Sequence, residues 1–161
     1  MLVVAIALGL HTIAAPRAQT RAPSTHAPRA KHFPSASIRI TDAWVRAAPP
    51  YAMMLAGYMT LRNDGAGPVR MVSAESVAFG SVAAHRTVVE DGISRMRPAG
   101  EVRIPAYGSV HFGPGGLHLM LMQPTRMVKL GDVLHFRLRF SDGGIREVEF
   151  PVRAEAPSVR Q

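Results

Sequence analysis

Four side chains in this chain are of types that bind soft metal ions. They are His85, Met96, His118 and Met120, separated in turn by ten, twenty-one and one intervening residues. Imidazole nitrogen and thioether sulfur together suit copper, and above all Cu(I), because a soft ion accepts neutral sulfur donors that zinc, magnesium or calcium would not. The chain has nine methionines and no cysteine, so such a site cannot be lost to disulfide formation outside a reducing cytosol.

Two of the four side chains are close together on one segment. In residues 116–122, Gly-Leu-His-Leu-Met-Leu-Met, strand alternation puts three leucines on one face and His118, Met120 and Met122 on the other. Residues two apart on a strand have Cα atoms roughly 7 Å apart, so His118 and Met120 could reach one ion. Spacing alone cannot bring His85 and Met96 to the same point. Taken singly, a methionine stripe or a lone histidine is more often structural.

Composition limits the possible classes of protein. A length of 161 residues corresponds to about one domain. The absence of cysteine excludes a blue-copper centre, a thiolate zinc site, a CxxC redox pair and the cysteine-linked lipid of a bacterial lipoprotein. The net charge is +8, and half of it comes from four cations in residues 1–37, a segment without acids. The remaining arginines are scattered, so we expect no nucleic-acid binding.

The chain divides into four parts. Residues 1–18 contain an apolar run, 2–15, of the length of a signal-peptide core, although no Lys or Arg precedes it. Residues 19–37, rich in Pro, Ala and Arg, are expected to form a disordered linker. Residues 38–153 are the predicted domain, and 154–161 a short tail. This organisation predicts an exported, periplasmic protein with no membrane span in its mature form.

The domain is predicted to be all-β. Runs typical of strands cover 38–46, 54–62, 68–76, 81–89, 93–97, 109–112, 117–122, 133–140 and 145–152. Turn signals such as Asp91-Gly92 and 142–144 (Asp-Gly-Gly) separate them, and no stretch of useful length has a helical period. A spacing of about 8–12 residues between turns favours an antiparallel β-sandwich with Greek-key connections.

The pattern His-x10-Met-x21-His-x-Met resembles the signature of the periplasmic PCu(A)C copper-chaperone family. The resemblance extends over about residues 38–153, through Ala43-Trp44-Val45-Arg46, Ala56-Gly57-Tyr58, Glu90-Asp91-Gly92, Ile104-Pro105-Ala106 and Leu130-Gly131-Asp132. It implies a cupredoxin-like fold and a single Cu(I) bound by His85, Met96, His118 and Met120. It also implies a carrier rather than an enzyme. The implied recipient is the copper subunit of a terminal oxidase or its Sco-type assembly factor.

Some residues near the predicted ligands have two interpretations. Arg86, Arg95 and Arg97 could weaken Cu(I) binding or could form a docking surface for an acidic partner. Five further methionines could line a copper entrance, but we expect packing in the core or in loops: Met53, Met54, Met59, Met122 and Met127.

Two other functions compete with the copper carrier. The first is an exported β-sandwich whose methionine-rich face binds a protein partner without metal. The second is a redox enzyme in which copper cycles between its two oxidation states, which thioether ligation disfavours because it stabilises Cu(I). His111 and His135 are single strand histidines and are expected at the surface. No Ser-His-Asp arrangement, phosphate loop or paired carboxylates support any other enzyme.

Overall fold

The computed structural model describes residues 37–156. The predicted signal peptide and nearly all of the predicted linker lie outside this range, as do residues 157–161. Ten strands and no α-helix are found in the described range. Accordingly, none of these residues forms a helix that could span a membrane.

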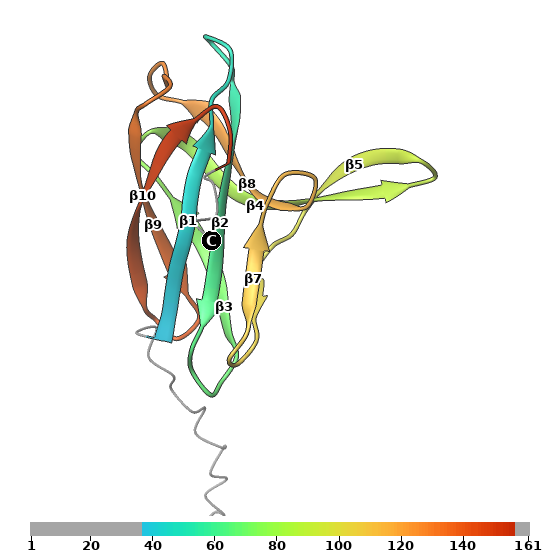
Figure 1. Cartoon of the computed structure of the whole chain (residues 1–161), viewed down its shortest axis with the longest axis vertical. Helices are drawn as coiled ribbons and strands as arrows, with labels where there is room; N and C mark the ends of the chain where they lie inside the picture. Colours follow the sequence, from blue (N-terminus) through green and yellow to red (C-terminus); the bar gives the residue numbers. More distant parts are fainter. Residues whose placement is uncertain (1–36, 157–161) are drawn as a thin grey trace, which may run out of the picture. The chain divides into compact units, whose positions relative to one another are not determined.

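The strands follow one another closely along the chain (Figure 1). Their bounds are β1 (Ile38–Arg46), β2 (Met54–Asn63), β3 (Val69–Glu75), β4 (Phe79–Glu90), β5 (Ile93–Pro98), β6 (Val102–Ile104), β7 (Ser109–Phe112), β8 (Leu117–Pro124), β9 (Val133–Phe140) and β10 (Ile145–Arg153). All nine predicted strands are present, with ends within two residues of those expected. β6 was not predicted, because three residues are too few to show an alternating pattern.

The strands form two layers that share one junction. One layer has the order β5-β4-β8-β2-β1, with β7 also paired to β2, and the other has the order β10-β9-β3-β6. Several neighbours, such as β4 and β8, are not consecutive in sequence, as in a Greek key. The all-β sandwich is confirmed, but it is not wholly antiparallel. β1 joins β10 in parallel through Val45–Val152 and Arg46–Arg153.

The core lies between the layers. β9 alternates strictly between exposed and buried residues, with Leu134, Phe136, Leu138 and Phe140 pointing inward. Phe136 lies against Phe150 of β10, with ring centroids 4.5 Å apart, and against Phe79 of β4 at 6.0 Å. On β8 the leucines at 117, 119 and 121 are almost fully buried, as the alternation predicted. The opposite face of β8 is therefore free to carry chemistry.

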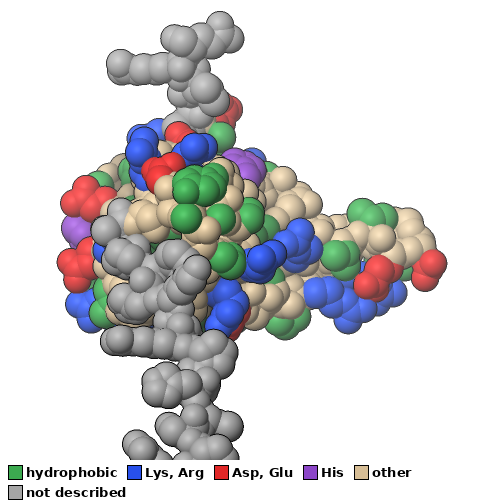
Figure 2. Space-filling model, turned by 90° about the horizontal axis from the view of Figure 1, so that it is seen from below, with side chains coloured by type: hydrophobic (Ala, Val, Ile, Leu, Met, Phe, Trp, Pro, Cys, Tyr) green, Lys and Arg blue, Asp and Glu red, His purple; other side chains and the backbone are tan. Residues whose placement is uncertain are grey.

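The hairpin of β4 and β5 projects from the packed sheets (Figures 1 and 2). Its turn has positive φ at both central residues, 53° at Asp91 and 76° at Gly92, while Glu90 pairs with Ile93. Two consecutive positive φ angles define a two-residue type I′ turn, which matches the twist of the flanking strands. All six residues of β5 are exposed. Its geometry therefore depends on the turn and on pairing with β4, not on the core.

Candidate metal centre

His85 and His118 lie side by side on neighbouring strands. They are directly opposite each other in the β4–β8 pair, and their rings stack with centroids 6.4 Å apart and planes 28° apart. His118 is buried, with 7% of its surface exposed, and His85 is half-buried. Directly opposed residues project on the same side of a sheet. The two imidazoles are thus brought together by pairing between segments 33 residues apart in sequence.

The two predicted methionine ligands lie on the same face. Met120 is two residues after His118 and pairs with Ala83, two residues before His85. On the other side of β4, Met96 pairs with Thr87, two residues after His85. Because the side-chain period of a strand is two, all four predicted ligands project from one face of β5, β4 and β8. The register thus puts side chains from three strands on one face, which the sequence alone could not establish.

Met96, His118 and Met120 line one hollow of about 250 Å³. We call it the methionine hollow, and its lining is Arg46, Ala47, Ala48, Met54, Leu55, Ala56, Met96, His118 and Met120. His85 is not part of this lining and adjoins the hollow through its stacking on His118. Met96 is 59% exposed. The hollow thus has a buried imidazole inside and an exposed thioether at its edge.

Both histidines hold one ring nitrogen in a backbone hydrogen bond. Nδ1 of His118 lies 3.0 Å from the carbonyl oxygen of Gly116, and Nδ1 of His85 lies 3.4 Å from that of Ala83. A carbonyl oxygen only accepts, so Nδ1 carries the proton and donates it. In a neutral ring this leaves a lone pair on Nε2, which is how metal-binding histidines are commonly oriented. The shorter bond makes His118 the better fixed of the two.

The register separates the arginines of the hairpin from the predicted ligands. Arg86 pairs with Arg97, and Arg95 pairs with Val88, so all three arginines project from the face opposite Met96. Glu90, on that same face, accepts a hydrogen bond from Arg97 at 2.8 Å and forms an ion pair with Arg95 at 3.5 Å. Figure 2 shows these basic side chains along the projecting arm, with acidic side chains near its end. The hairpin arginines are therefore not part of the methionine hollow.

Arg46 is the cation that lines the methionine hollow. It is exposed, at the end of β1, and it also acts on Tyr58. Burial raises the pKa of Tyr58 above its ordinary value, while the positive charge of Arg46 partly opposes that rise. Tyr58 stacks on Trp44, with ring centroids 4.8 Å apart. Sequence spacing gave no indication that Arg46 would lie at this site.

The other methionines differ in burial. Met59 is fully buried, as expected of a core residue, but the expectation of packing was wrong for Met53, Met54 and Met127, which are 65%, 57% and 41% exposed. Met54 lines the methionine hollow. Met53 and Met127 line a neighbouring hollow of about 290 Å³ with Tyr51, which we call the tyrosine hollow. Met54 is the first residue of β2, and Met53 and Met127 lie in loops.

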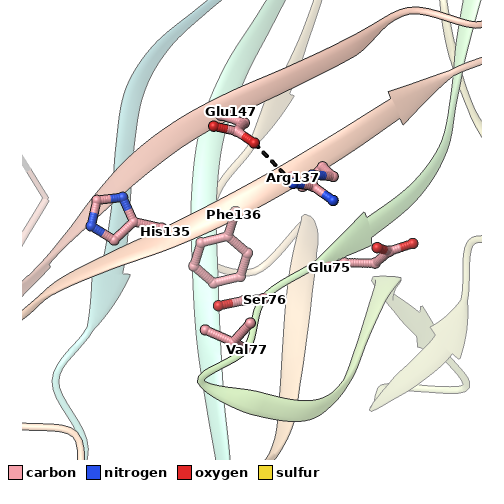
Figure 3. Close-up of a pocket in the computed structure, with 7 residues that line it drawn as sticks. All are labelled: Glu75, Ser76, Val77, His135, Phe136, Arg137 and Glu147. Carbon is pink, nitrogen blue, oxygen red and sulfur yellow. Dashed lines mark hydrogen bonds and ion pairs between the residues drawn. The ribbon is translucent and has the colours of Figure 1, made fainter.

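Another hollow, around His135, is larger but differs in its chemistry. Figure 3 shows a larger hollow, about 450 Å³, where Arg137 donates to Glu147 at 3.0 Å beside Phe136 and His135. These are exposed ion pairs along a sheet surface. Within the described range, no three His, Cys, Asp or Glu side chains are placed to hold a metal ion. The two imidazoles near Met96 and Met120 are therefore the strongest candidate for a metal centre.

Comparisons with known proteins agree on the family. Residues 38–152 match the profile of a family described as "Putative lipoprotein LpqE-like". A relative from Leifsonia xyli subsp. xyli (strain CTCB07), named "Putative lipoprotein Lxx21020", is 37% identical over 117 residues. These residues are 72% of this chain and 69% of the relative.

Solved structures agree on the fold. The solution structure of apo-DR1885 from Deinococcus radiodurans is 29% identical, with a TM-score of 0.58, covering 90% of this chain and 96% of that one. The Cu(I) form of DR1885 gives a TM-score of 0.60 at 29% identity, covering 83% and 87%. The copper-bound PCuAC domain from PmoF2 shares the fold, with a TM-score of 0.62 at 24% identity over 74% of this chain and 94% of the domain. The chain therefore belongs to the LpqE-like family, and the resemblance to PCu(A)C domains found in its sequence is confirmed.

Proposed function

We propose that this protein is a copper carrier that binds one Cu(I) ion through His85, Met96, His118 and Met120. The observation that supports it best is the strand register, which puts all four side chains on one face. The free Nε2 lone pairs of the two histidines add to it. DR1885, 29% identical to this chain, has been solved with Cu(I).

The donor set suits a carrier better than an enzyme. Two imidazoles and two thioethers are neutral, so the loaded site keeps the single positive charge of Cu(I). Thioethers favour Cu(I) over Zn and disfavour oxidation to Cu(II). Neutral ligands also hold the ion less tightly than thiolates would, which allows release. The copper ion is the cargo of the protein. No covalent bond of a substrate is made or broken.

We propose the periplasm as the place of action and a respiratory copper centre as the destination. The relatives' description as lipoproteins supports export. The recipient would be the copper subunit of a terminal oxidase or a Sco-type assembly factor. Mixing the Cu(I)-loaded protein with each purified apo-recipient, and measuring copper in each after separation, would distinguish the two routes.

A second candidate function is a metal-independent docking module. The tyrosine hollow supports it, because Tyr51 is 83% exposed and Met53 65% exposed at its rim. Exposed apolar patches often mark interaction sites. Partner binding of this kind would persist without copper and would survive loss of the predicted ligands.

Competition for Cu(I) tests the proposal. The parent protein is titrated without oxygen against a chromogenic Cu(I) chelator, beside the double variant Met96→Leu/Met120→Leu. We expect one equivalent bound by the parent and a loss of affinity of at least about a hundredfold in the variant, because changes around a metal site commonly cost about 10–100-fold each.

The control is Met53→Leu/Met127→Leu. It removes the same number of thioethers from the tyrosine hollow, where both side chains lie. Leucine approximately conserves volume, so folding should be retained in both variants. The proposal fails if the parent does not compete, or if both double variants lose copper equally.

A further inference from the structure

The structure places a third thioether, Met54, at the methionine hollow. Met54 lines this hollow together with Met96, His118 and Met120. It does not belong to the His-x10-Met-x21-His-x-Met pattern, and it comes from β2, which carries none of the four predicted ligands. One hollow of about 250 Å³ thus has a thioether from each of β2, β5 and β8.

The β2–β8 register directs Met54 to the ligand face. Met54 pairs with Met122, and Ala56 pairs with Met120. Met54 is therefore the diagonal neighbour of Met120, a relation with Cα atoms about 7–8 Å apart, which long side chains span. Ala56, two residues after Met54, is directly opposite Met120. Its methyl group is too short to separate the two thioethers. The backbone is fixed here, because the amide of Gln123 donates to the carbonyl of Met53 at 3.0 Å.

Met54 and Met96 are much more exposed to solvent than His118. Met54 is 57% exposed and Met96 is 59% exposed, whereas His118 is only 7% exposed. An ion entering or leaving therefore meets Met54 or Met96 before it meets His118. Met96 belongs to β5, whose residues are all exposed. Few buried contacts mean a low local stability, so Met96 is the donor whose position is least fixed.

We propose that Met54 is an exchange ligand for Cu(I), which replaces Met96 during capture and release. In the exchange the bond from copper to the Met96 sulfur breaks as a bond to the Met54 sulfur forms. Copper remains Cu(I), both thioethers are neutral before and after, and no proton moves. Copper thereby keeps its number of ligands while the hairpin side of the site opens to a recipient. This inference rests on the proposed function and adds a ligand to that site.

The first test measures copper binding when Met96 is absent. Met96→Leu is compared with Met54→Leu/Met96→Leu by anaerobic Cu(I) competition and by copper X-ray absorption. We expect Met96→Leu to keep one equivalent of Cu(I) and two sulfur ligands, because Met54 takes the vacant place. The double variant should keep one sulfur and bind at least about tenfold more weakly.

The second test measures exchange. The loaded parent, Met54→Leu and Met53→Leu are mixed with excess chelator, and copper transfer is followed by stopped flow. We expect transfer from Met54→Leu to be slower by at least about tenfold, and transfer from Met53→Leu to match the parent, since Met53 lies in the tyrosine hollow.

Each result separates this inference from the proposed function. Equal affinity and one sulfur ligand in both Met96→Leu and the double variant would make Met54 only an apolar wall and would overturn the inference, while the carrier function stands. Absence of Cu(I) binding by the parent would instead overturn the proposed function and the inference with it.

Discussion

At the scale of residues, His118 has the properties of an inner metal ligand. It is buried, it lies opposite His85, and a backbone carbonyl orients its ring. Thioethers approach from strands on both sides of it. With Nδ1 bonded to the carbonyl of Gly116, the neutral ring keeps a lone pair on Nε2. That lone pair is the one that Cu(I) would bind.

The positive charges of Arg46 and Arg86 should affect Cu(I) binding to different extents. Arg46 lines the methionine hollow, whereas Arg86 projects from the other face of the hairpin. A cation near the ion opposes its binding, and exposed charge pairs interact by about 0.2–1 kcal/mol. We expect Arg46→Gln to bind Cu(I) about twofold to fivefold more tightly and Arg86→Gln to change by less, in the competition titration. A larger gain from Arg86→Gln would mean that the hairpin's cations, not Arg46, face the metal. Added salt should shrink the effect of Arg46→Gln.

At the scale of elements, the β4–β5 hairpin sets the position of Met96. All six residues of β5 are exposed, so its shape depends on the Asp91-Gly92 turn and on its pairing with β4. The other three predicted ligands lie on β4 and β8, which are packed into the sandwich. The site therefore joins a rigid part, β8 with the paired portion of β4, to an element that few contacts hold.

Substituting Gly92 should separate copper binding from stability. Gly92 has φ of 76°, where an alanine side chain costs about 1 kcal/mol or more. We expect Gly92→Ala to loosen the hairpin and to weaken Cu(I) binding about fivefold, while the free energy of unfolding measured in urea stays near that of the parent.

Gly143→Ala is the matched control. Gly143 has φ of 83° in the β9–β10 turn, between strands that carry Phe136 and Phe150 of the core. It should lower the free energy of unfolding by about 1 kcal/mol and leave Cu(I) affinity unchanged. If Gly143→Ala weakened Cu(I) binding and Gly92→Ala did not, the position of Met96 would not depend on the Asp91-Gly92 turn.

A second element-scale prediction concerns the turn after β2. Asp64 accepts hydrogen bonds from Arg62 at 2.6 Å and from Arg39 of β1 at 3.0 Å. The bond from Arg62, and then the positive charges of both arginines, hold the pKa of Asp64 below its ordinary value despite some desolvation. A carboxyl group with a lowered pKa in the folded state stabilises the protein above its unfolded pKa, about 3.9. That contribution is lost as the pH falls through the lower folded pKa.

We therefore expect Asp64→Asn to be less stable than the parent at pH 7, with the difference shrinking as the pH falls below about 3.9 and through the lower folded pKa of Asp64. Urea denaturation across this pH range measures it. Asp91→Asn provides the comparison, because Asp91 forms no ion pair within residues 37–156 and asparagine tolerates its positive φ. A constant difference between Asp64→Asn and the parent at every pH would contradict the ionic explanation.

At the scale of the whole molecule, alternation predicted most of the fold. The leucines of β8 and the buried residues of β9 each follow a period of two, and strong turn signals separate the strands. The parallel contact between β1 and β10 could not be predicted, because it pairs residues more than 100 positions apart. β6 is a three-residue strand whose existence depends on its pairing with β3.

The site required information that local patterns do not contain. His118 and Met120 share a face by their spacing, but His85 and Met96 reach that face only through the registers of β4 with β8 and β5. Those registers also decide that the hairpin arginines project away from the site. The exposure of Met54, at the first residue of β2, depends on tertiary packing, which no period reveals.

Copper K-edge X-ray absorption of the protein loaded with one equivalent of Cu(I) tests the central claim most directly. We expect a mixed coordination shell with two imidazole nitrogens and two sulfurs, and the loss of one sulfur in Met120→Leu. A shell of nitrogen and oxygen alone, or one that still has two sulfurs when both Met96 and Met120 are leucine, would contradict this ligand set.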